Sequence, residues 1–129
     1  MVKFTKKDAE EALKKGAKSI SKDDLKKVLE KRKEIEGKFK GSKALSRFVG
    51  DIKLLFSVVK DYITGDYKKI PWWSVAAIVF TLLYVVSPMD IIPDFIPLIG
   101  SLDDVLIVGV CLAVIDSDLH TYKEWKEKN

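Results

Sequence analysis

One long apolar segment limits what this chain can fold into, because the segment must be either buried or placed in a membrane. Between Ile70 and Ile115, 32 of the 46 residues are apolar, and the four charges are all aspartates. The remaining 83 residues carry every Lys, Arg and Glu. With 129 residues in total, the chain has room for one domain built around this segment.

Charge follows the same division along the chain. Residues 1–69 carry 20 Lys and Arg against 11 Asp and Glu, a net charge of +9, whereas residues 70–129 carry 3 against 8, a net charge of −5. A basic region ahead of an apolar unit is typical of attraction to an anionic lipid bilayer. Basic regions also bind nucleic acid, but that partner is disfavoured, because no basic helix interleaves aromatic residues for base stacking.

Helix signals recur along the chain, and alternating strand patterns are nearly absent. Thr5 with Asp8, and Ser21 with Asp24, are capping pairs that open two weakly amphipathic helices, and we expect Gly37 to end the second. A wide apolar stripe from Leu45 to Ile63 then predicts a helix near 43–64 that lies against the apolar segment or a membrane. We therefore expect an all-α chain with a charged helical arm at 1–41, followed by a unit at 42–129 that holds the amphipathic helix and the apolar segment.

The apolar segment predicts an antiparallel hydrophobic helical hairpin with helices at about 71–86 and 102–122. Pro88 ends the first helix, because a proline pushes the residue before it out of the helical region. The reversal that follows is rich in Pro and Asp. The first apolar run has 17 residues, about 25 Å of helix, just short of the ~30 Å hydrocarbon core of a bilayer. A buried central helix of a bundle is therefore the alternative to a membrane span.

The reversal carries a specific motif, which reads Ser-Pro-x-Asp-x-Ile-Pro-Asp-x-Ile-Pro-x-x-Gly-x-x-Asp-Asp from Ser87 to Asp104. This motif closely resembles the signature of the YkvA-like domain family of bacteria and archaea. The similarity covers Ile70 to Ile115, the core motif of the hairpin, and includes the Pro-Trp-Trp at its start. The resemblance implies a small membrane protein of a family with unknown function and no accepted catalytic residues.

Four aspartates of the reversal form the first candidate site, an acidic turn cluster of Asp90, Asp94, Asp103 and Asp104. We expect these carboxylates to cap helices and to hold the turn. Converging carboxylates also suit Mg²⁺, Ca²⁺ or a proton relay at membrane depth, so an ion site is the alternative. Whether a metal binds there is open at this point.

The second candidate site is a membrane-interface anchor at the start of the hairpin. It consists of Lys68, Lys69, Trp72 and Trp73. Lysines favour lipid headgroups, and tryptophans favour the boundary between headgroups and acyl chains.

No catalytic constellation is present, because His120 is the single histidine and there is neither a P-loop nor a dinucleotide-binding glycine motif. We expect no enzyme activity and no cofactor. The leading hypothesis is a membrane-associated protein that inserts the hairpin into an anionic lipid bilayer. Lys68, Lys69 and Lys123 flank the hairpin, which predicts both termini on the cytoplasmic face. A protein partner or self-association is open as well.

Two alternatives keep the hairpin out of the membrane, at least at first. One is a soluble helical bundle that shields the hairpin and inserts on delivery, as a secreted pore-forming toxin or effector would. The other is a soluble scaffold or partner-binding module that never inserts. Because the first apolar run begins 70 residues into the chain, we expect no secretory signal peptide.

Overall fold

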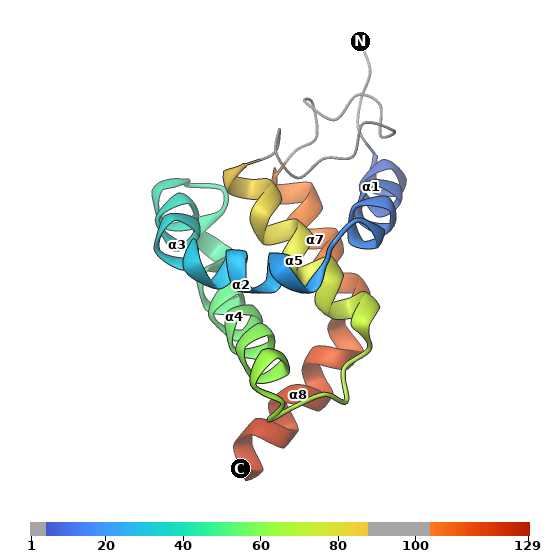
Figure 1. The fold of residues 1–129 in the computed structure, drawn as a ribbon. Coiled ribbons are helices and arrows are strands. Elements are labelled where there is room, and N and C mark those ends of the chain that lie inside the picture. Colours follow the sequence, from blue (N-terminus) through green and yellow to red (C-terminus); the bar gives the residue numbers. More distant parts are fainter. Residues whose placement is uncertain (1–4, 88–103) are drawn as a thin grey trace.

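The computed structural model describes residues 5–87 and 104–129 as an assembly of helices (Figure 1). In chain order the elements are α1 (Lys6–Lys18), α2 (Lys22–Glu30), α3 (Arg32–Gly41), a 3-10 turn (Ser46–Phe48), α4 (Val49–Thr64), α5 (Trp72–Val86), α7 (Asp104–Val114) and α8 (Asp116–Lys128). No strand occurs within these two ranges. The all-α prediction is confirmed.

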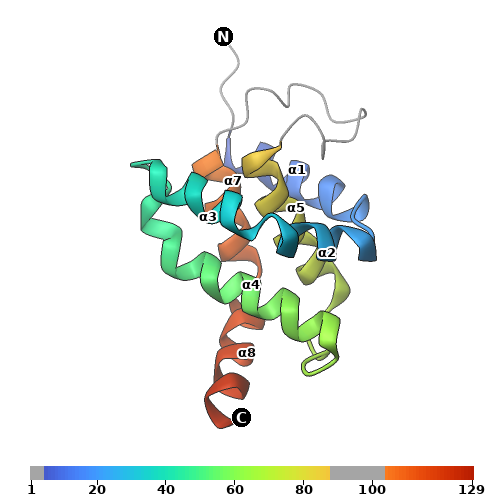
Figure 2. The ribbon, with the colours of Figure 1, turned by 60° about the vertical axis from the view of Figure 1, so that its left-hand side comes forward.

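Helix α5 is the centre of the structure. Helices α1, α2, α3, α4 and α7 all pack against it. In Figure 1, α2 crosses in front of α5, and α1 and α4 lie on either side of it; the turned view of Figure 2 brings α4 to the front. Every residue from Ser74 to Val85 is buried. The first apolar helix therefore lies inside a bundle in this structure.

The composition of α5 explains its central position. Of its 15 residues, only Ser74 and Thr81 are polar, so the helix has no face suited to water. A helix that is apolar all round has to be surrounded on all sides. Ser74, near its start, is matched by Asp118 of α8, because the Ser74 hydroxyl donates a hydrogen bond of 2.6 Å to that carboxylate.

Helix α1 approaches α5 through small residues. The buried residues of α1 are Ala9, Ala12, Leu13, Gly16 and Ala17. Gly16 lies directly against the ring of Phe80, and a Cβ atom at this position would overlap the ring. The lack of a side chain at Gly16 is therefore what lets the two helices come this close.

Both predicted capping pairs are confirmed, since Thr5 with Asp8 and Ser21 with Asp24 form capping boxes. The expectation that Gly37 ends the second helix is wrong. The chain leaves the helix at Lys31 and resumes it as α3, which runs through Gly37 to Gly41. Ile35 and Phe39 on either side are fully buried, and their burial outweighs the cost of about 1 kcal/mol for a glycine inside a helix.

The amphipathic stripe is buried as the sequence predicts, but its helix begins later than the expected position near 43. A 3-10 turn begins at Ser46, and α4 follows from Val49 to Thr64. Leu45, Phe48, Ile52, Leu55, Phe56 and Val59 are buried in the core of the bundle. The stripe thus faces the apolar segment, as expected.

The second half of the apolar segment differs from the prediction of one helix at 102–122. It forms two helices, α7 and α8, which meet at Ile115 and are bent by 66°. Ile115 is fully buried, and the bend turns Leu119 and Tyr122 of α8 toward the core as well. Helices α5 and α7 contact each other, but the reversal at 88–103 lies outside the described residues, so the hairpin connection stays a prediction.

The close approach of α1 to α5 can be tested with two glycine variants. Gly16→Ala should lower the free energy of unfolding by about 1–3 kcal/mol, because the new methyl group overpacks the core against Phe80. Gly37→Ala, in open space on α3, should raise it by about 0.4–1 kcal/mol. Urea unfolding followed by circular dichroism measures both. Equal stabilisation by the two variants would contradict the packing of α1 described above.

Candidate functional site

The predicted interface anchor lies in the connection between α4 and α5. Gly65 ends α4 in a left-handed conformation, with φ of 89°, and its N–H bonds to the carbonyls of Asp61 and Tyr62. Tyr67 and Ile70 in this connection are 3 % exposed each, so they attach it to the core. Lys68 and Lys69 lie between these two buried side chains and are exposed. Because the residues before and after them are buried, the two lysines point outward.

The two tryptophans of the anchor diverge. Trp72 is 36 % exposed, and its ring lies 6.1 Å from the ring of Tyr62, which Lys68 Nζ also approaches to 5.2 Å. Trp73 is partly buried and lines a separate groove of about 160 Å³ with Leu13 of α1 and Val114 of α7. Trp72 and Lys68 therefore share Tyr62 as a neighbour, whereas Trp73 lies on another surface.

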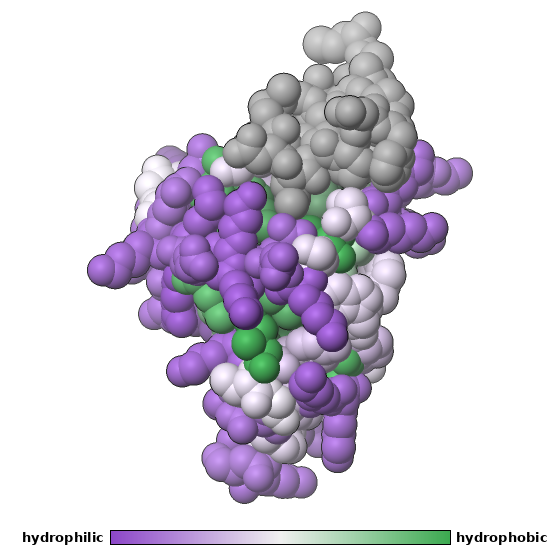
Figure 3. All heavy atoms as spheres, viewed as in Figure 1, coloured by the Kyte–Doolittle hydropathy of each residue, from purple (hydrophilic) through white to green (hydrophobic). Residues whose placement is uncertain are grey.

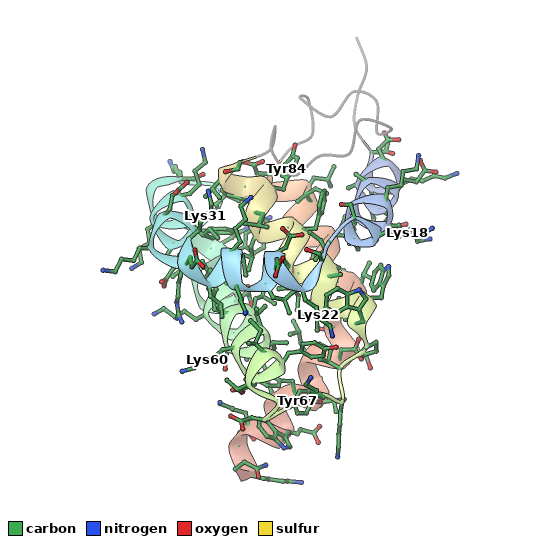
Figure 4. All side chains as sticks on the ribbon, viewed as in Figure 1. Lys18, Lys22, Lys31, Lys60, Tyr67 and Tyr84 are labelled. Atoms are coloured by element: carbon green, nitrogen blue, oxygen red, sulfur yellow. The ribbon has the colours of Figure 1, made fainter. Side chains whose placement is uncertain are left out.

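A basic pocket adjoins the anchor and was not predicted from the sequence. It encloses about 330 Å³ between α2 and the end of α4. Its lining residues are Lys22, Asp23, Leu25, Lys26, Tyr62, Ile63 and Lys68. In Figure 4, Lys22 lies on the lower half of the molecule, as does Tyr67 of the α4–α5 connection. Nothing in the pattern of α2 indicates that its lysines meet a residue more than 40 positions further along the chain.

The acidic turn cluster falls largely outside the described residues. Asp90, Asp94 and Asp103 belong to the segment that is not described, and only Asp104 is placed, as the first residue of α7. In the described part of the chain, no three His, Cys, Asp or Glu side chains gather where they could hold a metal ion. The capping and ion-binding hypotheses for the cluster both stay predictions.

A buried carboxylate links α4 to α8. Asp61 accepts hydrogen bonds from the Tyr122 hydroxyl at 2.6 Å and from Lys126 Nζ at 3.0 Å. The Tyr122 hydroxyl also lies 2.5 Å from Ser57 Oγ. The ring of Tyr67 packs edge-on against Tyr122, with 5.1 Å between centroids. Through these contacts α8 is attached to α4 by one charged group and an aromatic cluster.

The contacts of Asp61 shift its ionisation. Burial raises the pKa of this carboxyl, but the hydrogen bonds from Tyr122 and Lys126 and the positive charge of Lys126 outweigh burial, so the pKa lies below its ordinary 3.8. Burial, followed by the bond to Asp61, raises the pKa of Tyr122 to about 12, which keeps its hydroxyl protonated as a donor. By contrast, His120 is 72 % exposed and pairs with Glu124 on the surface.

The pattern of the sequence also missed this contact, since Asp61 stands on the polar side of the stripe and its partners follow 61 and 65 positions later. No short-range spacing connects them.

The comparisons with known proteins point to one family. The family model described as "Protein of unknown function (DUF1232)" matches residues 74–110, which include most of α5 and the start of α7. The "Uncharacterized membrane protein YkvA" of Bacillus subtilis (strain 168) is 32 % identical over 75 residues, which is 58 % of this chain and 71 % of that protein. No solved structure matches. The chain is thus a small all-α protein with a central apolar helix, and it belongs to the YkvA-like family.

The described helices are short for a membrane span. Among the described helices, none is long and apolar enough to cross a bilayer alone. Helices α7 and α8 satisfy the length and composition test only as a pair, bent by 66°. Helix α5 is apolar but has 15 residues.

The role of Asp61 can be tested through the pH dependence of stability. A carboxyl whose pKa is lowered in the folded state stabilises above its unfolded pKa, and this contribution is lost as pH falls through the folded value. Asp61→Asn should therefore cost roughly 1 kcal/mol at pH 7, a modest value because Lys126 is half-exposed. The difference from the wild type should shrink below about pH 4, in the range between the two pKa values.

Denaturant unfolding between pH 7 and pH 3 measures this difference, with the exposed Asp66→Asn variant as the control. A loss for Asp61→Asn that is the same at both ends of the pH range would show that its charge is not what stabilises α8.

Proposed function

We propose that this protein attaches to the surface of anionic lipid bilayers through its interface anchor. The observation that carries this proposal is the exposure of Lys68 and Lys69 beside the partly exposed Trp72. The relative in Bacillus subtilis is named a membrane protein, which supports a bilayer as the partner. The net charge of +9 over residues 1–69 would draw this part of the chain to anionic lipid.

We further propose that attachment precedes entry of the α5–α7 hairpin into the bilayer. The support is the composition of α5, which carries two polar residues in 15 and is covered by other helices rather than exposed. Residues 1–41 then serve as a removable cover. The cover is polar outside, and Figure 3 shows hydrophilic side chains over most of the face that α2 occupies. In this proposal both termini stay on the cytoplasmic face.

We propose that α1 is the part of the cover that is released first. Four of its five buried residues are alanine or glycine, which bury little apolar area, whereas α3 and α4 bury Ile35, Phe39 and Phe56. Because stabilisation follows the apolar area removed from water, the small side chains of α1 themselves contribute little to holding it on α5. In this proposal the protein binds a bilayer and then inserts into it, and neither step needs a catalytic group.

Charge reversal at the anchor tests the attachment. Lys68→Glu/Lys69→Glu should weaken partitioning to vesicles of phosphatidylcholine and phosphatidylglycerol by roughly thirtyfold or more, since each lysine near an anionic surface contributes about 1 kcal/mol. Binding to vesicles of phosphatidylcholine alone should change little. The difference should decrease in 0.5 M salt, because exposed charges are screened. Vesicle flotation of the full-length chain measures all three.

Lys6→Glu/Lys7→Glu is the matched control, because it changes the net charge by the same amount at exposed lysines at the start of α1, and it should weaken binding less than the anchor variant. Equal weakening on both vesicle types would contradict a role for surface charge. A wild-type chain that floats with neither vesicle would refute the proposed attachment, and leave the scaffold that never inserts as the remaining hypothesis. Leakage of vesicle contents would favour the pore-forming alternative.

A further inference from the structure

We propose that the basic pocket between α2 and α4 binds the phosphate group of an anionic phospholipid. This inference rests on the proposed attachment to bilayers and deepens it, since it assigns a headgroup site beside the anchor. Neither the family model nor the relative from Bacillus subtilis describes such a site.

The charge of the pocket suits an anion. Lys22 and Lys26 are four positions apart on α2 and therefore share one face of the helix, while Lys68 reaches the same pocket from the α4–α5 connection. Within the described residues none of these three lysines takes part in an ion pair. Asp23 is the one acidic group of the lining, so three positive charges face one negative charge. Ammonium groups are common partners of phosphate oxygens.

The apolar wall of the pocket favours a lipid over a free anion. Leu25, Tyr62 and Ile63 form this wall. The ring of Tyr62 has the ammonium of Lys68 5.2 Å from its centroid, and the ring of Trp72 lies 6.1 Å away. Tyr62 thus joins the lysines to the exposed indole of the anchor. If the lysines bind the phosphate of a phospholipid, the acyl chains of that lipid would lie next to Trp72. Tryptophan favours this boundary between headgroups and hydrocarbon.

A second basic surface on the molecule provides the comparison. Arg47, Lys53 and Lys123 line an open depression between α4 and α8. Among the described residues, no aromatic side chain lines it. If positive charge alone decided binding, the two surfaces would bind the same ligands. If the aromatic wall and Trp72 matter, the α2–α4 pocket should bind the lipid and the α4–α8 surface should not.

Titration with a water-soluble lipid tests this difference. The probe is dihexanoyl phosphatidic acid, kept below its micelle concentration and added to the full-length chain labelled with ¹⁵N. We expect amide shift changes at the start of α2 and from Tyr62 to Lys68. Lys22→Gln/Lys26→Gln should raise the dissociation constant about twenty-five-fold, near fivefold for each lysine. Lys53→Gln/Lys123→Gln should leave it unchanged.

The sign of the Asp23 effect identifies the bound group. Asp23→Asn removes the one negative charge of the lining, so it should tighten binding of dihexanoyl phosphatidic acid. Weaker binding by Asp23→Asn would mean that the pocket recognises a cationic headgroup, and would overturn the proposal. Equal losses in the two lysine double variants would overturn it too, since general charge would then explain binding.

Two further probes separate the sources of phosphate. Dihexanoyl phosphatidylcholine should bind more weakly than dihexanoyl phosphatidic acid, because its quaternary ammonium repels the lysines. Inorganic phosphate should also bind more weakly, because it gains nothing from the apolar wall. Equal affinity for inorganic phosphate would overturn the assignment to a lipid.

If the wild type floats with anionic vesicles but the probe does not shift the pocket residues, lipid binding in the pocket is refuted and the attachment stands. If the wild type does not float, both are refuted.

Discussion

The apolar surface of α5 has to be kept from water on every side, and the arrangement of the other helices follows from this requirement. Each buried Val, Leu, Ile or Phe contributes about 1.5–3 kcal/mol relative to its exposed state. Twelve consecutive residues of α5, Ser74 to Val85, are buried. The amphipathic helices α1 to α4 each supply one apolar face to this surface, α7 packs against it as well, and α8 contacts it through Asp118. Their polar faces then form the outside of the bundle, which gives the molecule its basic surface.

The contacts around α5 are unequal, and this difference connects the fold to the proposed function. Helices α3 and α4 present large side chains to the core, and α4 is joined to α8 through Asp61, Tyr122 and Lys126. Helix α1 presents mainly small residues and depends on the close fit of Gly16 against Phe80. The anchor lies at the start of α5, at the opposite end of this helix from Val86. Attachment and opening can therefore involve different parts of the molecule.

Short-range patterns predicted a large part of this fold. The two capping boxes, the stripe of α4 and the extent of α5 depend on residues within a few positions of one another, so spacing alone was sufficient. The break at Lys31, the helical state of Gly37 and the bend at Ile115 were missed. Each of these features depends on which side chains are buried in the assembled core. The burial of Ile35, Phe39 and Ile115 outweighs the local sequence signals.

The candidate site was predicted in part for the same reason. Lys68, Lys69 and Trp72 are close in sequence, so their grouping was visible. Trp73 is equally close, yet successive helical residues point about 100° apart, and the packing of α1 and α7 assigns it to another groove. Lys22 and Lys26 join the site only because α2 folds across α5 and meets the end of α4. No property of α2 alone contains that information.

Hydrogen exchange of the full-length chain, free and bound to anionic vesicles, tests the central claim that α5 is covered in the free chain and that α1 is the part of the cover released at the membrane. The account predicts that the amides of α5 are among the slowest to exchange in both states, whereas those of α1 become fast on vesicles. Fast exchange of α5 in the free chain would contradict its central burial. Unchanged protection of α1 in the vesicle-bound chain would contradict the release of the cover.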